Sequence, residues 1–200
     1  MKTTPAQIII FCMSLCLIMP PQARGEETLE NAALLIIDIQ NFYFPEGRLP
    51  LAEPEKAGRN AQALLQAFRE KGKLVVHVRH NFEPGGEIHA DVAPKAGEKV
   101  ISKDNANAFK DTDLLEFLKA NEIKTVVICG MQTHMCVEAG ARAASDLDFE
   151  VIVAHDACAT RALKFGDLEV SAQDVHASTL SALSGSYAEV VDTVAILKRL

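Results

Sequence analysis

Residues 33–38 read ALLIID, a continuous apolar run that ends in an acidic side chain. Similar runs recur at residues 74–78 (LVVHV), 125–129 (TVVIC) and 150–154 (EVIVA). These runs lack the alternation of a strand with one solvated face, and they are rich in β-branched residues. The four runs therefore predict parallel strands that are covered on both faces. Weaker strand candidates are residues 99–102 (KVIS) and 189–192 (EVVD).

Segments with helical spacing of apolar residues lie between these strands. They are residues 57–71, 113–120, 135–147 and 171–183. Strands that alternate with helices imply right-handed crossover connections and a parallel sheet. We therefore expect an α/β fold, a doubly wound and mostly parallel sheet of about six strands with helices on both faces, in three layers.

Two long stretches resist regular structure. Residues 40–54 contain three prolines, and residues 80–97 contain Pro84-Gly85-Gly86. Both follow the carboxyl ends of predicted strands, which is where open α/β sheets place their ligands. The two loops are candidate walls of a pocket for a small-molecule substrate.

The composition excludes several classes of protein. The chain has 200 residues, 48% of them hydrophobic, and a formal net charge of −7. This is typical of a globular protein and provides no cationic surface for nucleic acid. No GxGxxG or GxxxxGK[ST] motif is present, so no nucleotide cofactor is expected. No repeat or linker divides the chain.

The amino terminus has the pattern of a secretory signal peptide. Lys2 precedes an apolar run from Ile8 to Met19, and Ala23 and Gly25 lie three and one positions before a plausible cleavage point. The run is shorter than the roughly 20 residues of a membrane span. We expect a signal peptide at residues 1–25, a mature domain at 26–200 in the periplasm or medium, and no membrane association after cleavage. The alternative is a buried or anchoring N-terminal helix.

The mature chain would keep three cysteines, Cys129, Cys136 and Cys158, so at least one thiol should be free. Cys129 falls inside a predicted strand and Cys158 in a predicted loop, and both are expected to be inert. Cys136 falls in the first turn of a predicted helix, where unpaired N–H groups favour a thiolate and can bind an oxyanion. A purely structural cysteine is the alternative at this position.

Two charged residues follow other predicted strands and should lie beside Cys136. Asp38 ends the first strand, and Lys103 follows the KVIS segment. A carboxylate can accept the thiol proton, and an ammonium group stabilises both anions. We expect Lys103 and the helix end to outweigh Asp38 and so favour the thiolate. The alternatives are a capping role for Asp38 and a solvated surface charge for Lys103.

Several motifs together form a recognisable pattern. They are residues 35–40 (LIIDIQ) with Phe42, Lys103 with residues 107–109 (NAF), the GxxTxxCV motif of residues 130–137, residues 156–159 (DACA), and residues 175–176 (VH) leading into Leu180 and Leu183. In these motifs the chain resembles the isochorismatase-like cysteine hydrolases, the superfamily that includes nicotinamidases and N-carbamoylsarcosine amidohydrolases. The match covers nearly the whole mature chain.

The resemblance implies a triad of Cys136, Asp38 and Lys103 that cleaves its substrate through a thioester on the cysteine. It also implies a cis peptide bond between Met131 and Gln132, with the amides of Gln132 and Cys136 as oxyanion donors. A homo-oligomer is expected, because oligomers are common in this superfamily.

Departures from the superfamily narrow the expected chemistry. The segment after the first strand has no Asp-x-His pair of the kind that holds a metal in nicotinamidases, and His77 and His80 should point to opposite faces, so no metal is expected. Known isochorismatases carry glycine where Cys136 stands, so the cysteine favours an amidase. The remaining alternatives are a vinyl-ether hydrolase with Asp38 as acid and a ligand-binding module without turnover.

Four side chains are candidate substrate contacts: Phe42, Phe109, His80 and His134.

Overall fold

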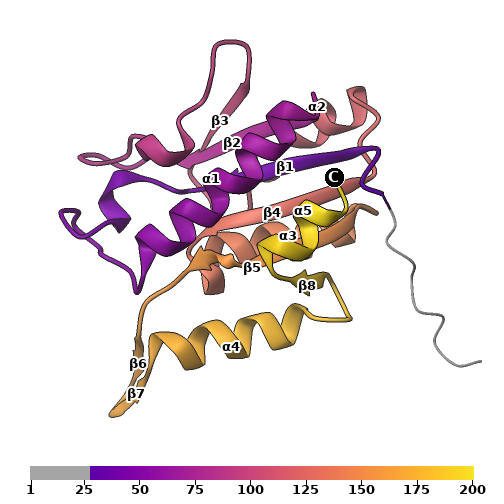
Figure 1. Cartoon of the computed structure of the whole chain (residues 1–200). Helices are drawn as coiled ribbons and strands as arrows, with labels where there is room; N and C mark the ends of the chain where they lie inside the picture. Colours follow the sequence, from indigo (N-terminus) through magenta and orange to yellow (C-terminus); the bar gives the residue numbers. More distant parts are fainter. Residues whose placement is uncertain (1–27) are drawn as a thin grey trace, which may run out of the picture.

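The computed structural model describes residues 28–200, which form a six-stranded sheet with helices on both faces (Figure 1). The strand order is β3-β2-β1-β4-β5-β8, and all five pairings are parallel. The strands are β1 (Ala32–Ile37), β2 (Leu74–His80), β3 (Lys99–Lys103), β4 (Thr125–Met131), β5 (Glu150–Ala159) and β8 (Glu189–Val191). The predicted α/β fold and its six strands are confirmed. The predicted signal peptide lies outside the described residues.

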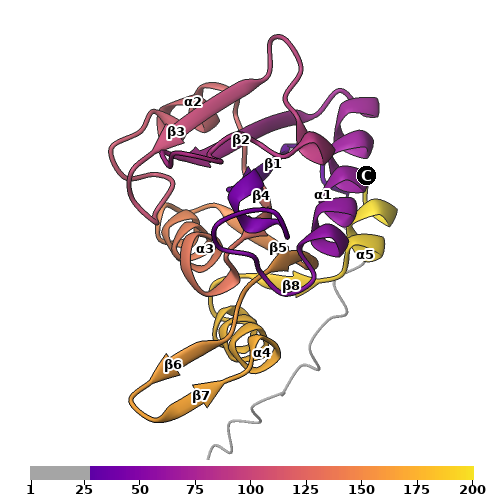
Figure 2. The same cartoon turned by 90° about the vertical axis from the view of Figure 1, so that its left-hand side faces the viewer.

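The central strand β1 is buried along its whole length, which explains its uninterrupted apolar sequence. Its side chains alternate between two cores. Leu34 and Ile36 belong to the cluster that contains residues of α1 (Pro54–Glu70) and α5 (Thr193–Lys198). Leu35 and Ile37 pack with α2 (Leu114–Ala120) and α3 (Glu138–Asp146) on the opposite face. Figure 2 shows these two helical layers on either side of the sheet.

The last third of the chain adds a part that projects from this body. Helix α4 (Ala172–Leu183) follows an antiparallel hairpin of β6 (Leu163–Phe165) and β7 (Leu168–Val170), and both extend away from the sheet (Figures 1 and 2). Phe165 and Leu168 at the hairpin tip are 85% and 63% exposed. No helix within residues 28–200 is long and apolar enough to cross a membrane.

Some local expectations need correction. The helix predicted over residues 135–147 begins later, because a π-helical turn, η3 (Thr133–Val137), precedes α3 and contains Cys136. Cys158 lies within β5 rather than in a loop. The two predicted loops contain short 3-10 turns, η1 (Asn41–Tyr43) and η2 (Ala90–Val92).

Candidate active site

Asp38 is the first residue after β1 and is fully buried. Its φ of 52° lies in the left-handed region, which aspartate enters more readily than most residues. The Asp38 N–H still bonds to the carbonyl of Val78 in β2 (2.9 Å). The backbone therefore turns sharply at the strand end while its position remains fixed to the sheet.

Lys103 reaches Asp38 from the end of β3, and its side chain is also fully buried. Strand β2 lies between β3 and β1, so the long lysine side chain spans the end of the intervening strand. Its Nζ lies 2.7 Å from Asp38 Oδ2. The two charges thus form a buried ion pair at the carboxyl edge of the sheet.

Cys136 completes the group from the η3 turn after β4. The Lys103 Nζ lies 3.3 Å from the Cys136 Sγ, so the ammonium group bridges the thiol and the carboxylate. Gly130 allows the carboxyl ends of β1 and β4 to lie close together, because a Cβ there would be 1.9 Å from the carbonyl oxygen of Ile37, the residue before Asp38. The Met131–Gln132 peptide bond is cis, as the resemblance implies.

The electrostatics of the thiol differ from expectation. Burial and the nearby Asp38 raise the pKa of Cys136 to about 12, and the opposing effect of Lys103 is too small to reverse this. Burial also raises the pKa of Asp38 above its ordinary value, although Lys103 acts in the other direction. The expectation that Lys103 and the helix end stabilise a resting thiolate is therefore wrong. The sequence did not show how deeply Cys136 is buried, and burial disfavours the charged form of a thiol.

His80 and His134, two of the four candidate substrate contacts, lie in different places. His80 Nδ1 is 3.4 Å from Lys103 Nζ, so this ring borders the triad. His134 Nδ1 instead lies 2.6 Å from Thr160 Oγ1, beyond the end of β5.

The two phenylalanines pack on opposite sides of the sheet. The Phe42 ring is buried against Tyr43 and Phe82, with centroids 4.1 and 4.5 Å away. The partly buried Phe109 stacks on Phe149 at 6.2 Å.

Gln132 forms a polar contact directly before the η3 turn. Its Nε2 donates to the Tyr43 hydroxyl at 3.3 Å. Among the described residues, Gln132 Oε1 and Asp38 Oδ1 are buried acceptors without a hydrogen-bond partner. Buried acceptors without a partner are uncommon, and a catalytic role is one of the reasons for which proteins keep them.

Gln40 supports the site, although sequence reasoning gave it no role. Its Nε2 donates to the carbonyls of His80 (2.9 Å) and Gly86 (2.7 Å), and its Oε1 accepts the His80 N–H (2.9 Å). Gln40 thus joins the β1 end to the second long loop. Its place in the LIIDIQ motif, two residues after Asp38, was the available signal.

The other two cysteines of the described residues differ from Cys136 in their surroundings. All three are free thiols, but Cys129 and Cys158 are buried within strands. Burial raises the pKa of both, to about 12 for Cys158. In the described part of the chain no three His, Cys, Asp or Glu residues cluster as metal ligands, and His77 bonds to Glu98 at 3.0 Å.

A protein-family model described as the isochorismatase domain matches residues 32–193, a range that contains Asp38, Lys103 and Cys136. The chain belongs to the isochorismatase family. This isochorismatase-family hydrolase is 45% identical to the Bacillus subtilis protein YddQ, an uncharacterized member, over 84% of this chain and 99% of YddQ.

Two further proteins are similar to this isochorismatase-family hydrolase over most of its length. A crystal structure from Oleispira antarctica, named as an isochorismatase hydrolase, is 44% identical with a TM-score of 0.81, and the match covers 86% of this chain and 98% of that one. Maleamate amidohydrolase from Pseudomonas putida is 31% identical over 80% of this chain and 82% of its own. The family and its hydrolytic character are thus shown.

Proposed function

We propose that this hydrolase cleaves a small amide, carbamoyl or related acyl substrate through a thioester on Cys136. The observation that carries the proposal is the buried Lys103 ammonium group, which contacts the Asp38 carboxylate and the Cys136 sulfur at once. Similarity to maleamate amidohydrolase supports an amide as the scissile group. The cysteine itself supports covalent rather than direct hydrolysis.

In the proposed first half-reaction, Asp38 accepts the Cys136 proton while the sulfur attacks the carbonyl carbon of the substrate. The carbonyl oxygen becomes an oxyanion, for which the amides of Gln132 and Cys136 are the proposed donors. Asp38 then gives its proton to the leaving nitrogen, and the carbon–nitrogen bond breaks. The amine or ammonia departs, and the acyl group stays on the sulfur.

In the proposed second half-reaction, water attacks the thioester carbon and loses its proton to Asp38. The carbon–sulfur bond breaks, the acid product leaves, and Asp38 returns the proton to the sulfur. Lys103 keeps its charge throughout and stabilises each anion in turn. Because the pKa of Cys136 is about 12, the thiol is neutral at rest and requires this base.

The function is tested by ammonia release from a panel of small primary amides and carbamoyl compounds, with mass spectrometry of the quenched protein. We expect at least one compound to release ammonia and to leave an acyl adduct on the Cys136 peptide. Conversion of isochorismate to pyruvate without an adduct would instead support the vinyl-ether hydrolase. Binding without turnover of any compound would support the ligand-binding alternative.

The pH dependence of kcat/KM should follow the ionisation of the Asp38 carboxyl group. The base must be ionised, and burial raises its pKa, so we expect kcat/KM to fall with decreasing pH at values above the ordinary aspartate pKa of about 4. The rate should then stay level up to about pH 9, because the thiol titrates near 12. Profiles from pH 4 to 10 measure this. A profile that stays level down to about pH 4 would contradict the assignment.

We also propose that the protein is exported and forms a homo-oligomer. The charged start, short apolar run and Ala23-x-Gly25 support removal of residues 1–25. Intact-mass analysis of periplasmic or secreted protein should therefore give an N-terminus near Glu26, whereas full-length chain found only in the cytoplasm would contradict export. Light scattering of the purified protein measures the oligomeric state.

A further inference from the structure

The turn that carries Cys136 is held from two sides by side chains outside the motif. Thr133 Oγ1 lies 2.9 Å from Nδ1 of His176 in α4. His134 Nδ1 lies 2.6 Å from Oγ1 of Thr160, which follows β5 directly. Thr133 and His134 stand three and two residues before Cys136, at the start of η3.

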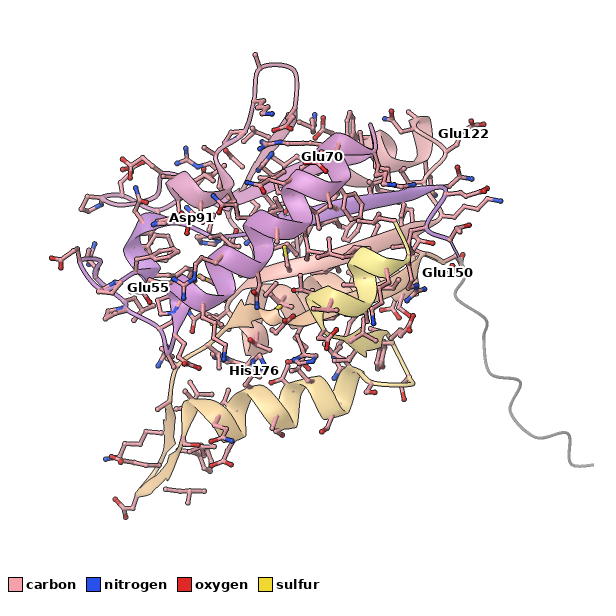
Figure 3. The ribbon with its side chains drawn as sticks, viewed as in Figure 1. Glu55, Glu70, Asp91, Glu122, Glu150 and His176 are labelled. Atoms are coloured by element: carbon pink, nitrogen blue, oxygen red, sulfur yellow. The ribbon has the colours of Figure 1, made fainter. Side chains whose placement is uncertain are left out.

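Both external partners are themselves firmly placed. Thr160 is only 3% exposed, and its carbonyl accepts the N–H of Ala52 at 2.8 Å. Ser171 caps the start of helix α4, and its side chain accepts the Asp174 N–H at 3.1 Å. Figure 3 shows His176 on the side of α4 that faces the body of the protein. The hydrogen bonds therefore connect the turn to two separate, ordered elements.

The backbone of η3 has hydrogen bonds of its own, and the two side-chain contacts add to them. The N–H groups of Met135 and Val137 both bond to the carbonyl of Gln132, at 3.0 and 3.3 Å. The first residues of a helical segment have no carbonyl of the preceding turn to bind. The side-chain hydrogen bonds of Thr133 and His134 therefore add a restraint at the start of η3.

We propose that His176 and Thr160 are positioning residues, which act through Thr133 and His134 to hold the Cys136 sulfur against Lys103 and Asp38. The inference rests on the proposed role of Cys136 as nucleophile. Neither residue contacts the triad, so neither is catalytic. Misplacement of a reacting atom by about 1 Å can lower a rate by about 100-fold, so loss of these contacts should affect reactivity more than stability.

The test compares four variants and one control variant with the wild-type full chain. His176→Ala and Thr160→Val remove the hydrogen bonds, whereas His176→Asn and Thr160→Ser keep a polar group near the same place. Thr179→Val is the matched control, because Thr179 is a buried α4 hydroxyl that donates to the Val175 carbonyl of its own helix at 2.9 Å.

Two probes report on Cys136 without knowledge of the natural substrate. Iodoacetamide measures the alkylation rate of the Cys136 peptide, and 4-nitrophenyl acetate measures its acylation. We expect both rates to fall by between about tenfold and about 100-fold in His176→Ala and Thr160→Val. His176→Asn and Thr160→Ser should recover most of the loss. Thr179→Val should react at the wild-type rate, even if its thermal midpoint falls by as much as those of His176→Ala and Thr160→Val.

Wild-type alkylation and acylation rates in both His176→Ala and Thr160→Val would overturn the proposal, as would faster alkylation in either. An equal fall in Thr179→Val would assign the effect to general destabilisation and overturn it as well. Failure of the proposed function gives a different result: 4-nitrophenyl acetate would leave no adduct on wild-type Cys136. The alkylation rates would still decide whether the two residues position the sulfur.

Discussion

Replacement of Cys136 by alanine should reduce ammonia release by about 10⁴-fold or more, with the fold intact. The substitution removes the only protein atom in the proposal that forms a covalent bond to the substrate, and members of such catalytic groups show losses of this order. The side chain is small and packs at the end of the sheet, so circular dichroism and the unfolding midpoint should change little. Turnover of the amide that proves active in the panel measures the effect.

Cys158→Ala provides the matched control for Cys136→Ala. Cys158 is also a buried free thiol near the carboxyl end of a strand, but its Sγ bonds to the Ala154 carbonyl at 3.3 Å. We expect wild-type turnover from this variant. If Cys136→Ala retained more than about a tenth of the activity, the covalent mechanism would be wrong, because water attack assisted by Asp38 would then explain the rate.

Replacement of Lys103 by methionine should abolish most turnover and also lower the free energy of unfolding by about 3–5 kcal/mol. The apolar side chain fills a similar volume but leaves the Asp38 carboxylate buried without its counter-ion. Removal of one partner of a buried ion pair is costly because the remaining charge stays desolvated. Urea unfolding and ammonia release measure the two effects separately.

The double variant Asp38→Asn/Lys103→Met separates the structural and catalytic contributions of this pair. With no buried charge left, it should regain much of the stability but remain inactive. Lys56→Met is the surface control, because Lys56 and Glu53 are mostly exposed and 3.8 Å apart, so its unfolding free energy should change by less than about 1 kcal/mol. A Lys103→Met variant as stable as Lys56→Met would show that Asp38 is not held as a buried carboxylate.

The sequence was informative where a residue is placed by a strand end. Asp38 and Lys103 follow apolar runs, and parallel strands bring their carboxyl ends to one edge, so the meeting of these residues with Cys136 followed from the order of elements. The β6–β7 hairpin had no such signal. Its strands have three residues each and its apolar side chains face outward, so no buried run marks them.

The sequence did not indicate which residues far apart in the chain form hydrogen bonds, or how deeply each side chain is buried. Thr133 and His176 are 43 positions apart, and only the packing of α4 against η3 brings them together. The direction of the Cys136 pKa shift depends on how completely water is excluded around it. A list of neighbouring charges cannot supply that quantity.

The place of β1 at the centre of the sheet has a consequence for how the chain acquires its structure during synthesis. Ala33 pairs with Leu74 on one side and with Val126 on the other, so the first strand to be made waits for a partner from the second half of the chain. Long-range pairing of this kind slows folding and exposes apolar segments to aggregation. Until β4 has emerged, one edge of this hydrophobic strand has no partner, and exposed edges of this kind favour aggregation. The triad, assembled from the ends of β1 and β3 and the turn after β4, can form only after that point.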